Sequence, residues 1–184
     1  MGVRPRYLEP AGPRVALRLL DRADEAEFIA VVRASAGLHH PWMSLPGTSQ
    51  EFGEFMARFD KPTANIGLVV CDLADDAIVG GLNINNIVYG RFQSAALGYW
   101  ASASVAGRGY MAEAIKLVIG YAFGPLGLHR LEANIQPAND ASIRLVKRSG
   151  FRYEGYSPDY LFIDGAWRGH ERWAITREMV EPAG

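Results

Sequence analysis

Apolar residues recur along the chain in short runs, some of them alternating with polar residues, as in strands whose successive side chains point to opposite faces. Seven such runs are predicted to be strands: Val15–Leu20, Ile66–Leu73, Ala77–Ile87, Ala95–Trp100, Leu128–Gln136, Phe151–Tyr160 and Arg168–Arg177. The second and third runs flank the short turn Ala74-Asp75-Asp76, which predicts a hairpin.

Elsewhere the apolar residues follow the spacing of one helix face, most clearly between Ala114 and Tyr121. Four helices are predicted, roughly at Ala23–Ala34, Ser49–Phe59, Tyr110–Phe123 and Asp140–Ser149. Asp21 can cap the first helix, and Thr48 with Glu51 forms a capping-box pattern before the second. The order of strands and helices predicts a mixed α/β fold.

No internal repeat or linker divides the chain, so a single α/β (α+β) domain is expected over residues 15–180. Residues 1–14, rich in proline and glycine, are expected to form a loose arm. A chain of 184 residues with 49% hydrophobic and 21% charged residues can bury a sizeable core, which argues against a mainly disordered protein.

Charge and cysteine content exclude several classes of function. Nineteen basic and twenty acidic side chains leave a net charge of −1, so neither a nucleic acid nor an anionic membrane is an expected partner. Cys71 is the only cysteine, which excludes an internal disulfide and a two-thiol metal site. Since residues 1–13 also lack the apolar core of a signal peptide, we expect a cytoplasmic protein without a metal.

The turn Gly107-Arg108-Gly109 lies between a predicted strand and a predicted helix. The first N–H groups of a helix lack partners within the helix, and the helix dipole favours anions there. Glycines let a phosphate approach the backbone closely, and Arg108 can add charge at the rim. The turn alone also fits an ordinary helix start, and Glu113, one turn later, is expected to have a structural role.

A second segment narrows the interpretation. Pro137–Ser142 opens a predicted helix, and Ser149-Gly150-Phe151 closes it. Together with Val105–Ala114, these residues resemble the GCN5-related N-acetyltransferase superfamily. More narrowly, they resemble its branch of ribosomal-protein N-terminal acetyltransferases of the RimJ and RimL type. The matching order of motifs extends over about residues 15–178.

The resemblance implies a twisted, mostly antiparallel sheet of about seven strands, in which the fourth and fifth strands, Ala95–Trp100 and Leu128–Gln136, splay apart. It implies that acetyl-CoA binds in this wedge, with its pyrophosphate on the backbone of the turn and Ser142 near the thioester sulfur. Asn139 would hydrogen-bond the pantetheine. The residues expected to bind acetyl-CoA are Tyr99, Trp100, Ala101, Gly107, Arg108, Gly109, Tyr110, Met111, Ala112, Asn139 and Ser142.

The chain departs from the superfamily pattern at three positions. Ala106 replaces the usual Gln or Arg at the start of the phosphate-binding turn, and Met111 replaces the usual small residue at its end. Val146 stands where many members carry a tyrosine that acts as general acid. Ser142, or water, is therefore expected to protonate the departing thiolate.

The general base is left open among four residues: Glu132, Glu154, His39 and His40. Glu154 is preferred because the RimJ-like branch often has an acid near that position, although each carboxylate also fits an exposed, structural role. His39, His40 and Trp42 belong to a loop expected to border the acceptor amine.

Three acceptor hypotheses remain open: a protein N-terminus, a small amine such as an antibiotic, polyamine or amino acid, and no acceptor at all in an acetyl-CoA-binding regulator. At pH 7 roughly 10% of peptide α-amines are neutral, against about 0.04% of lysine amines, so an α-amine needs little help from a base. The segment Ser35–Thr48 also contains no acid. A protein N-terminus is therefore the expected acceptor, and both a monomer and a homodimer remain open.

Overall fold

A computed structural model describes residues 7–8 and 10–180 of the chain. It contains one seven-stranded sheet with the strand order β1-β2-β3-β4-β5-β7-β6, in which only β4 and β5 run parallel. The strands are β1 (Val15–Leu19), β2 (Ile66–Asp72), β3 (Ile78–Val88), β4 (Ser94–Ala101), β5 (Arg130–Ile135), β6 (Arg152–Ile163) and β7 (Ala166–Thr176). All seven predicted strands are thus present, in the expected mixed sheet.

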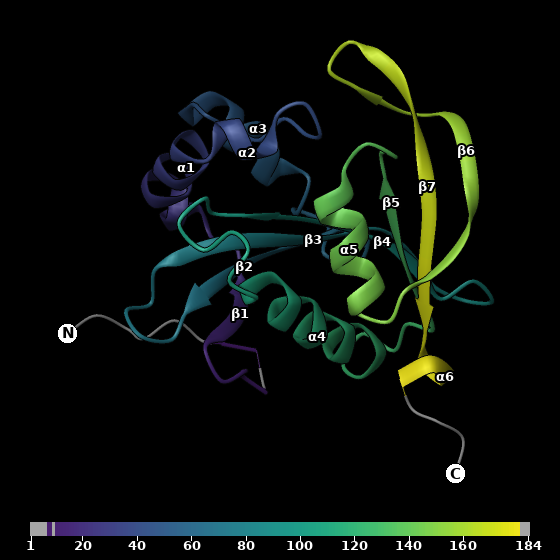
Figure 1. The fold of residues 1–184 in the computed structure, drawn as a ribbon. Helices are drawn as coiled ribbons and strands as arrows, with labels where there is room; N and C mark the ends of the chain where they lie inside the picture. The colour runs from purple at the N-terminus through teal and green to yellow at the C-terminus, as the bar shows by residue number, and fades with distance from the viewer. Residues whose placement is uncertain (1–6, 9, 181–184) are drawn as a thin grey trace.

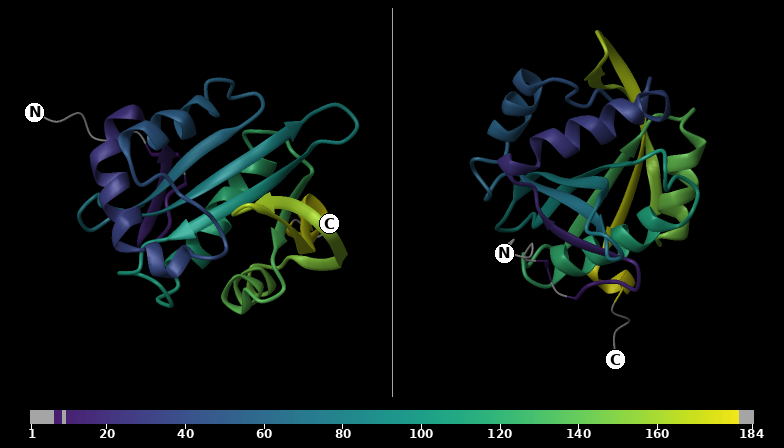
Figure 2. Two further views of the ribbon diagram at one scale, coloured as in Figure 1. Left: turned by 90° about the horizontal axis from the view of Figure 1, so that it is seen from above. Right: turned by 90° about the vertical axis from the view of Figure 1, so that its left-hand side faces the viewer.

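Helices cover both faces of the sheet (Figures 1 and 2). They are α1 (Glu25–Ala34), α2 (Ala36–His39), α3 (Ser49–Ala57), α4 (Tyr110–Phe123), α5 (Asp140–Arg148) and α6 (Arg177–Val180), with a 3-10 turn at Arg22–Asp24. Apolar side chains of α4 and α5 pack in the larger core cluster, while α1 and α3 pack with Trp100 in a second cluster on the other face. The sheet therefore lies between two apolar clusters.

The parallel pair β4 and β5 separates soon after it begins. Only Ser94–Ala96 pairs with Arg130–Glu132, although β4 continues to Ala101 and β5 to Ile135. The rest of β5 still pairs with β7 on its other side. The later part of β4 therefore presents a free backbone edge to the wedge, as expected for the fourth and fifth strands.

Part of the N-terminal arm is attached to the domain. The amide of Leu8 donates to the carbonyl of Leu17 over 2.7 Å, and Arg14 forms an ion pair with Glu113 over 3.1 Å. Leu8 is thus attached to β1 and Arg14 to α4. Residues 1–6 and 9 lie outside the described part.

The hairpin of β6 and β7 is longer than predicted and projects beyond the sheet (Figure 1). It closes at Asp164-Gly165, where both residues have positive φ angles, 51° and 75°. Two such residues make the kind of turn whose twist matches a hairpin, and Asp-Gly is one of its strongest sequence signals. The helix α2 was not predicted either, because only four residues form it.

No helix within residues 7–8 and 10–180 is long and apolar enough to cross a membrane. The same part of the chain contains no cluster of three or more His, Cys, Asp or Glu side chains arranged to hold a metal ion.

Candidate active site

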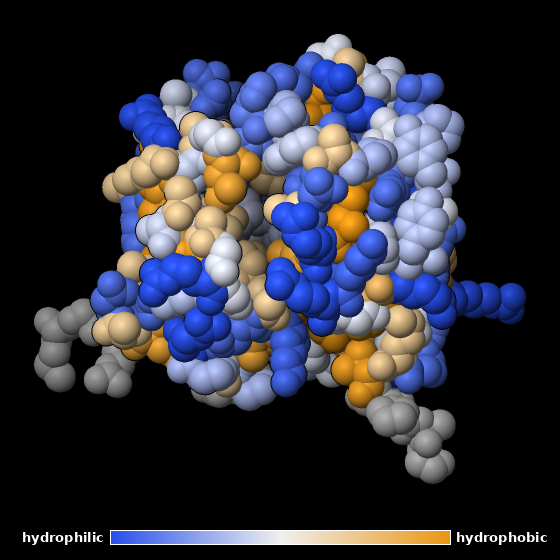
Figure 3. Space-filling view, in the orientation of Figure 1, coloured by the Kyte–Doolittle hydropathy of each residue, from blue (hydrophilic) through white to orange (hydrophobic). Residues whose placement is uncertain are grey.

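A cavity of about 750 Å³ opens where β4 and β5 diverge. Its walls come from six places: the free part of β4, the turn before α4 with the start of that helix, the end of β5, α5, the segment from Leu38 in α2 to Met43, and the β6–β7 hairpin. In Figure 3, hydrophobic residues reach the surface beside the hydrophilic outer side of α5. The cavity thus joins the two motifs that the sequence singled out, although these are 30 residues apart.

The glycine turn forms one end of the cavity. Gly107 and Gly109 line it and have φ angles of 75° and 86°, which few other residues adopt readily. Gly109 is the N-cap of α4, so no side chain caps the first N–H groups of this helix. Tyr110, Met111 and Ala112 follow and also line the cavity. Free N–H groups at a positive helix end suit an anionic phosphate.

Arg108 was predicted to lie at the rim of this site, but it does not line the cavity. Its guanidinium packs over the ring of Tyr110, 5.5 Å from the centroid, and donates to the carbonyl of Ser104. The cationic side chains that line the cavity are instead Arg144 and Arg148, from α5. Neither makes an ion pair with any described residue.

Glu113 has the structural role expected of it. Its carboxylate accepts hydrogen bonds from the amides of Arg14 and Val15 over 2.7 and 3.0 Å. Burial raises the pKa of Glu113, but these hydrogen bonds outweigh burial and keep the pKa below its ordinary value. The carboxylate therefore anchors β1 to α4.

The start of α5 forms the second wall. Asn139 caps this helix, its Oδ1 accepting from the amide of Ser142 over 3.2 Å. Because Oδ1 is engaged in this cap, the Asn139 Nδ2 group is the one that remains to hydrogen-bond a ligand. Val146, at the position where a tyrosine was sought, is fully buried in the core.

Ser142 has a partner that sequence reasoning missed. Its Oγ shares a short hydrogen bond with the hydroxyl of Tyr99, on β4, and both residues line the cavity. Burial raises the pKa of Tyr99 to about 12, so the phenol keeps its proton at neutral pH. Tyr99 was expected to bind acetyl-CoA, and no part in proton transfer was expected of it. A departing thiolate can therefore receive a proton from a pair of hydroxyl groups, one on β4 and one on α5.

Changing Tyr99 to Phe, or Ser142 to Ala, is expected to lower kcat about tenfold while acetyl-CoA affinity stays the same. The effect is modest because a thiol with a pKa near 8.5 leaves readily as its anion. Steady-state assays at saturating concentrations of both substrates give kcat, and titration calorimetry gives the affinity for acetyl-CoA. Wild-type kcat in the double variant would remove the pair from the reaction.

His39, in α2, and Trp42, shortly after it, also line the cavity. His39 is buried, and its Nε2 donates to the carbonyl of Ala101 over 2.9 Å. Trp100 also borders the cavity, but its ring packs edge-on against Phe28 at 5.1 Å and is 4% exposed, so it mainly belongs to the core.

His40 does not line the cavity. Its side chain is 78% exposed and lies 3.8 Å from Asp164 at the tip of the hairpin. The expectation that His40 contacts the acceptor is therefore not supported by its position. Adjacent histidines on one loop point to different surroundings here, which their sequence does not reveal.

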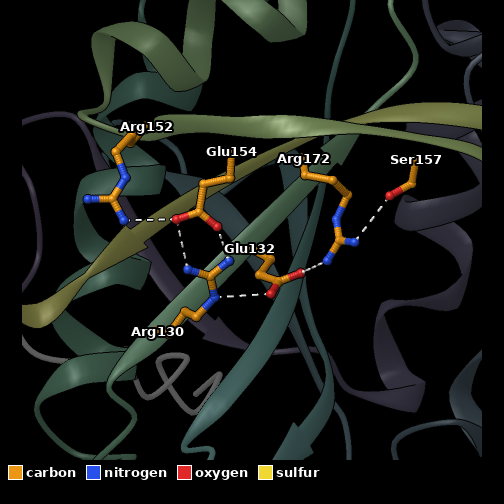
Figure 4. A network of polar contacts seen from close by, with 6 residues as sticks. All are labelled: Arg130, Glu132, Arg152, Glu154, Ser157 and Arg172. Carbon is orange, nitrogen blue, oxygen red and sulfur yellow. Dashed lines mark hydrogen bonds and ion pairs between the residues drawn. The ribbon is translucent and has the colours of Figure 1, made fainter.

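Glu132 and Glu154, the two candidate carboxylate bases, lie in an ion-pair network on the sheet (Figure 4). Arg130 contacts both carboxylates, Arg152 contacts Glu154 over 2.8 Å, and Arg172 contacts Glu132 over 2.5 Å. Neither carboxylate lines the cavity.

The surroundings of Glu154 make it a poor base. Hydrogen bonds from Arg130 and Arg152 lower the pKa of this carboxyl to about 2. The preference for Glu154 rested on an acid being common near this position, and the structure places it outside the cavity. We therefore assign both Glu132 and Glu154 to the stabilisation of the sheet.

Comparison with known proteins agrees with this geometry. The family model described as "Acetyltransferase (GNAT) domain" matches residues 14–152. The chain belongs to the GNAT acetyltransferase family. It is thus an acetyl-CoA-dependent N-acetyltransferase, and the family resemblance drawn from its motifs is confirmed. This family membership argues against the third hypothesis, a purely regulatory acetyl-CoA-binding protein.

Several members of the GNAT family resemble the chain closely. The "Probable N-acetyltransferase YjcK" of Bacillus subtilis (strain 168) is 31% identical over 94% of this chain and 92% of its own length. The [ribosomal protein uS5]-alanine N-acetyltransferase of Escherichia coli (strain K12) is 41% identical over 57% of this chain and 54% of its own. A structure of Mycobacterium smegmatis RimJ in complex with CoA-disulfide has a TM-score of 0.82 and 29% identity, and covers 92% and 85% of the two chains. The spermidine N(1)-acetyltransferase of E. coli also matches, at 26% identity over 92% of this chain and 90% of its own length.

The cavity fits acetyl-CoA, which supplies the thioester for the reaction of this family. The uncapped start of α4 and the positive φ angles of Gly107 and Gly109 suit its phosphates. The free edge of β4 can hydrogen-bond an extended pantetheine arm as a neighbouring strand would.

Proposed function

We propose that this GNAT enzyme acetylates the α-amine at the N-terminus of a protein or peptide. The observation that carries the proposal is the charge of the cavity. Among the described residues that line it, none is an aspartate or glutamate, and the fully charged ones are Arg144 and Arg148. A polyamine with several ammonium groups needs carboxylates around it, whereas a peptide brings one amine followed by neutral amide groups.

The acceptor side of the cavity is mostly apolar, with two neutral amides. Its lining residues are Leu38, Trp42, Met43, Asn134, Gln136, Leu161 and Ile163. Such walls suit the first residues of an extended chain, whose backbone can hydrogen-bond amide side chains or the free edge of a strand. Relatives that act on ribosomal protein uS5 and on spermidine both match the chain, so it is the lining that favours the peptide.

The experiment compares acceptors directly. With acetyl-CoA and detection of the released thiol, we expect kcat/KM for a short peptide beginning with alanine or serine to exceed that for spermidine at least tenfold. The peptide should carry an acetylated lysine, so that only its α-amine can react. A higher kcat/KM for spermidine would contradict the proposal and leave the acetyl-CoA site unchanged.

A further inference from the structure

A second buried histidine, His170, lines the cavity in addition to His39. His170 lies on β7, is 2% exposed, and lines the same cavity as Tyr99 and Ser142. Its Nδ1 lies 2.9 Å from the carbonyl oxygen of Arg168, two residues earlier on the strand. Because a carbonyl can only accept, Nδ1 carries the ring proton and donates it. In the neutral ring, Nε2 then has a free lone pair, as a proton acceptor requires.

His39 lines the cavity too, but with the opposite arrangement. Its Nε2, at the outer edge of the ring, donates to the carbonyl of Ala101. The remaining Nδ1 sits beside the residue's own backbone. His39 thus anchors α2 to the end of β4, whereas His170 uses its inner nitrogen for anchoring and leaves the outer one available. Of the two histidines, only His170 thus keeps its Nε2 atom without a hydrogen-bond partner among the described residues.

The surroundings of His170 keep it neutral. Burial lowers the pKa of this imidazole, against the opposing effect of the bond to the Arg168 carbonyl. The titratable or charged groups nearest it on this sheet face are Arg168 and Arg172 on β7, Tyr160 on β6, and Glu132 on β5. His39 faces the cavity from α2. The charges of Arg172 and Glu132 are directed at each other over 2.5 Å.

A second hydrogen-bond acceptor lies on the same face. Asn134 pairs in register with Arg172, two residues from His170, and it lines the cavity. Its Oδ1 is buried without a hydrogen-bond partner among the described residues. A reacting amine has two N–H bonds to direct, and this part of the cavity offers two acceptors for them.

We propose that His170 is the general base of the acetyl transfer. As the acceptor nitrogen bonds to the acetyl carbon, a proton leaves that nitrogen for His170 Nε2. The C–S bond breaks with its electron pair going to sulfur, and the thiolate takes a proton from the hydroxyl pair of Tyr99 and Ser142. The proposal rests on the N-acetyltransferase activity of the family and holds for any amine acceptor.

The test uses His170→Asn, because the Asn Nδ2 group can still donate to the Arg168 carbonyl while no atom replaces Nε2. The acceptor is whichever of the alanine peptide and spermidine the wild-type enzyme acetylates faster. We expect kcat to fall about 100-fold or more, with unchanged acetyl-CoA affinity by calorimetry. His39→Gln, which keeps a donor for the Ala101 carbonyl, should cost kcat far less.

The pH profile separates a base from a structural residue. Both the amine and His170 must be neutral, so the slope of log kcat/KM against pH should increase from one to two as the pH falls through the lowered pKa of His170, and should stay at one in His170→Asn. The same change of slope in the wild type and in His170→Asn would overturn the proposal. So would wild-type kcat in His170→Asn, or loss of kcat in Glu154→Gln instead. The acceptor comparison, made with the wild type, is independent of these outcomes.

Discussion

Replacing Gly107 by aspartate is expected to weaken acetyl-CoA binding roughly ten- to hundredfold compared with replacing it by asparagine. Gly107 has a φ angle of 75°, and an added Cβ would meet no atom within 4 Å. Asparagine and aspartate both tolerate this backbone region better than most residues, so the two variants share the same strain. They differ by one negative charge beside the phosphates, about 1–3 kcal/mol.

Titration calorimetry with acetyl-CoA measures this difference, and thermal unfolding checks that both variants fold equally well. The difference should shrink at high salt, because screening weakens the repulsion between exposed charges. Equal affinities of the aspartate and asparagine variants at low salt would show that the phosphates bind elsewhere.

The acetyl-CoA half of the site could be predicted from the sequence because its signals are local. The turn from Gly107 to Gly109 and the cap at Asn139 each lie within a few residues of the helix that they begin. The splayed fourth and fifth strands around them followed from the family resemblance. Local backbone geometry is what short motifs encode, and it accounts for this part of the cavity.

Of the residues proposed to transfer protons, Ser142 was expected from the sequence, but Tyr99 and His170 were not, because their roles depend on contacts between distant elements. Glu154 looked available in the sequence, but Arg130, 24 residues earlier, occupies its carboxylate. Tyr99 and Ser142 are 43 residues apart and meet only because β4 and α5 border one wedge. His170 drew no attention because alternation along a strand does not tell which face borders a cavity.

The extent of the β6–β7 hairpin was a missed signal rather than a hidden one. The pair Asp164-Gly165 between two predicted strands is a common hairpin turn, and both residues have positive φ. Recognising it would have extended the two strands to their full length. Leu161 and Ile163, near this turn, would then have been considered as walls of the acceptor site.

The second large effect expected is selectivity between amines. At pH 7 roughly 10% of an α-amine is neutral against about 0.04% of a lysine amine, a ratio of about 250. A neutral lysine amine is the better nucleophile, which offsets part of this ratio. Among the described residues that line the cavity, no aspartate or glutamate is present to attract the charged lysine side chain. We therefore expect the α-amine to react at least about fiftyfold faster at equal concentration.

The most direct test of this account places both amines in one molecule. A peptide with a free N-terminal alanine and a free lysine is incubated with the enzyme and acetyl-CoA, and the reaction is stopped while most of the peptide is still unmodified. Fragment masses then locate the acetyl group. We predict that nearly all of it is on the N-terminal alanine. Acetylation mainly at the lysine would contradict the account, as would an unmodified peptide under conditions in which spermidine is acetylated.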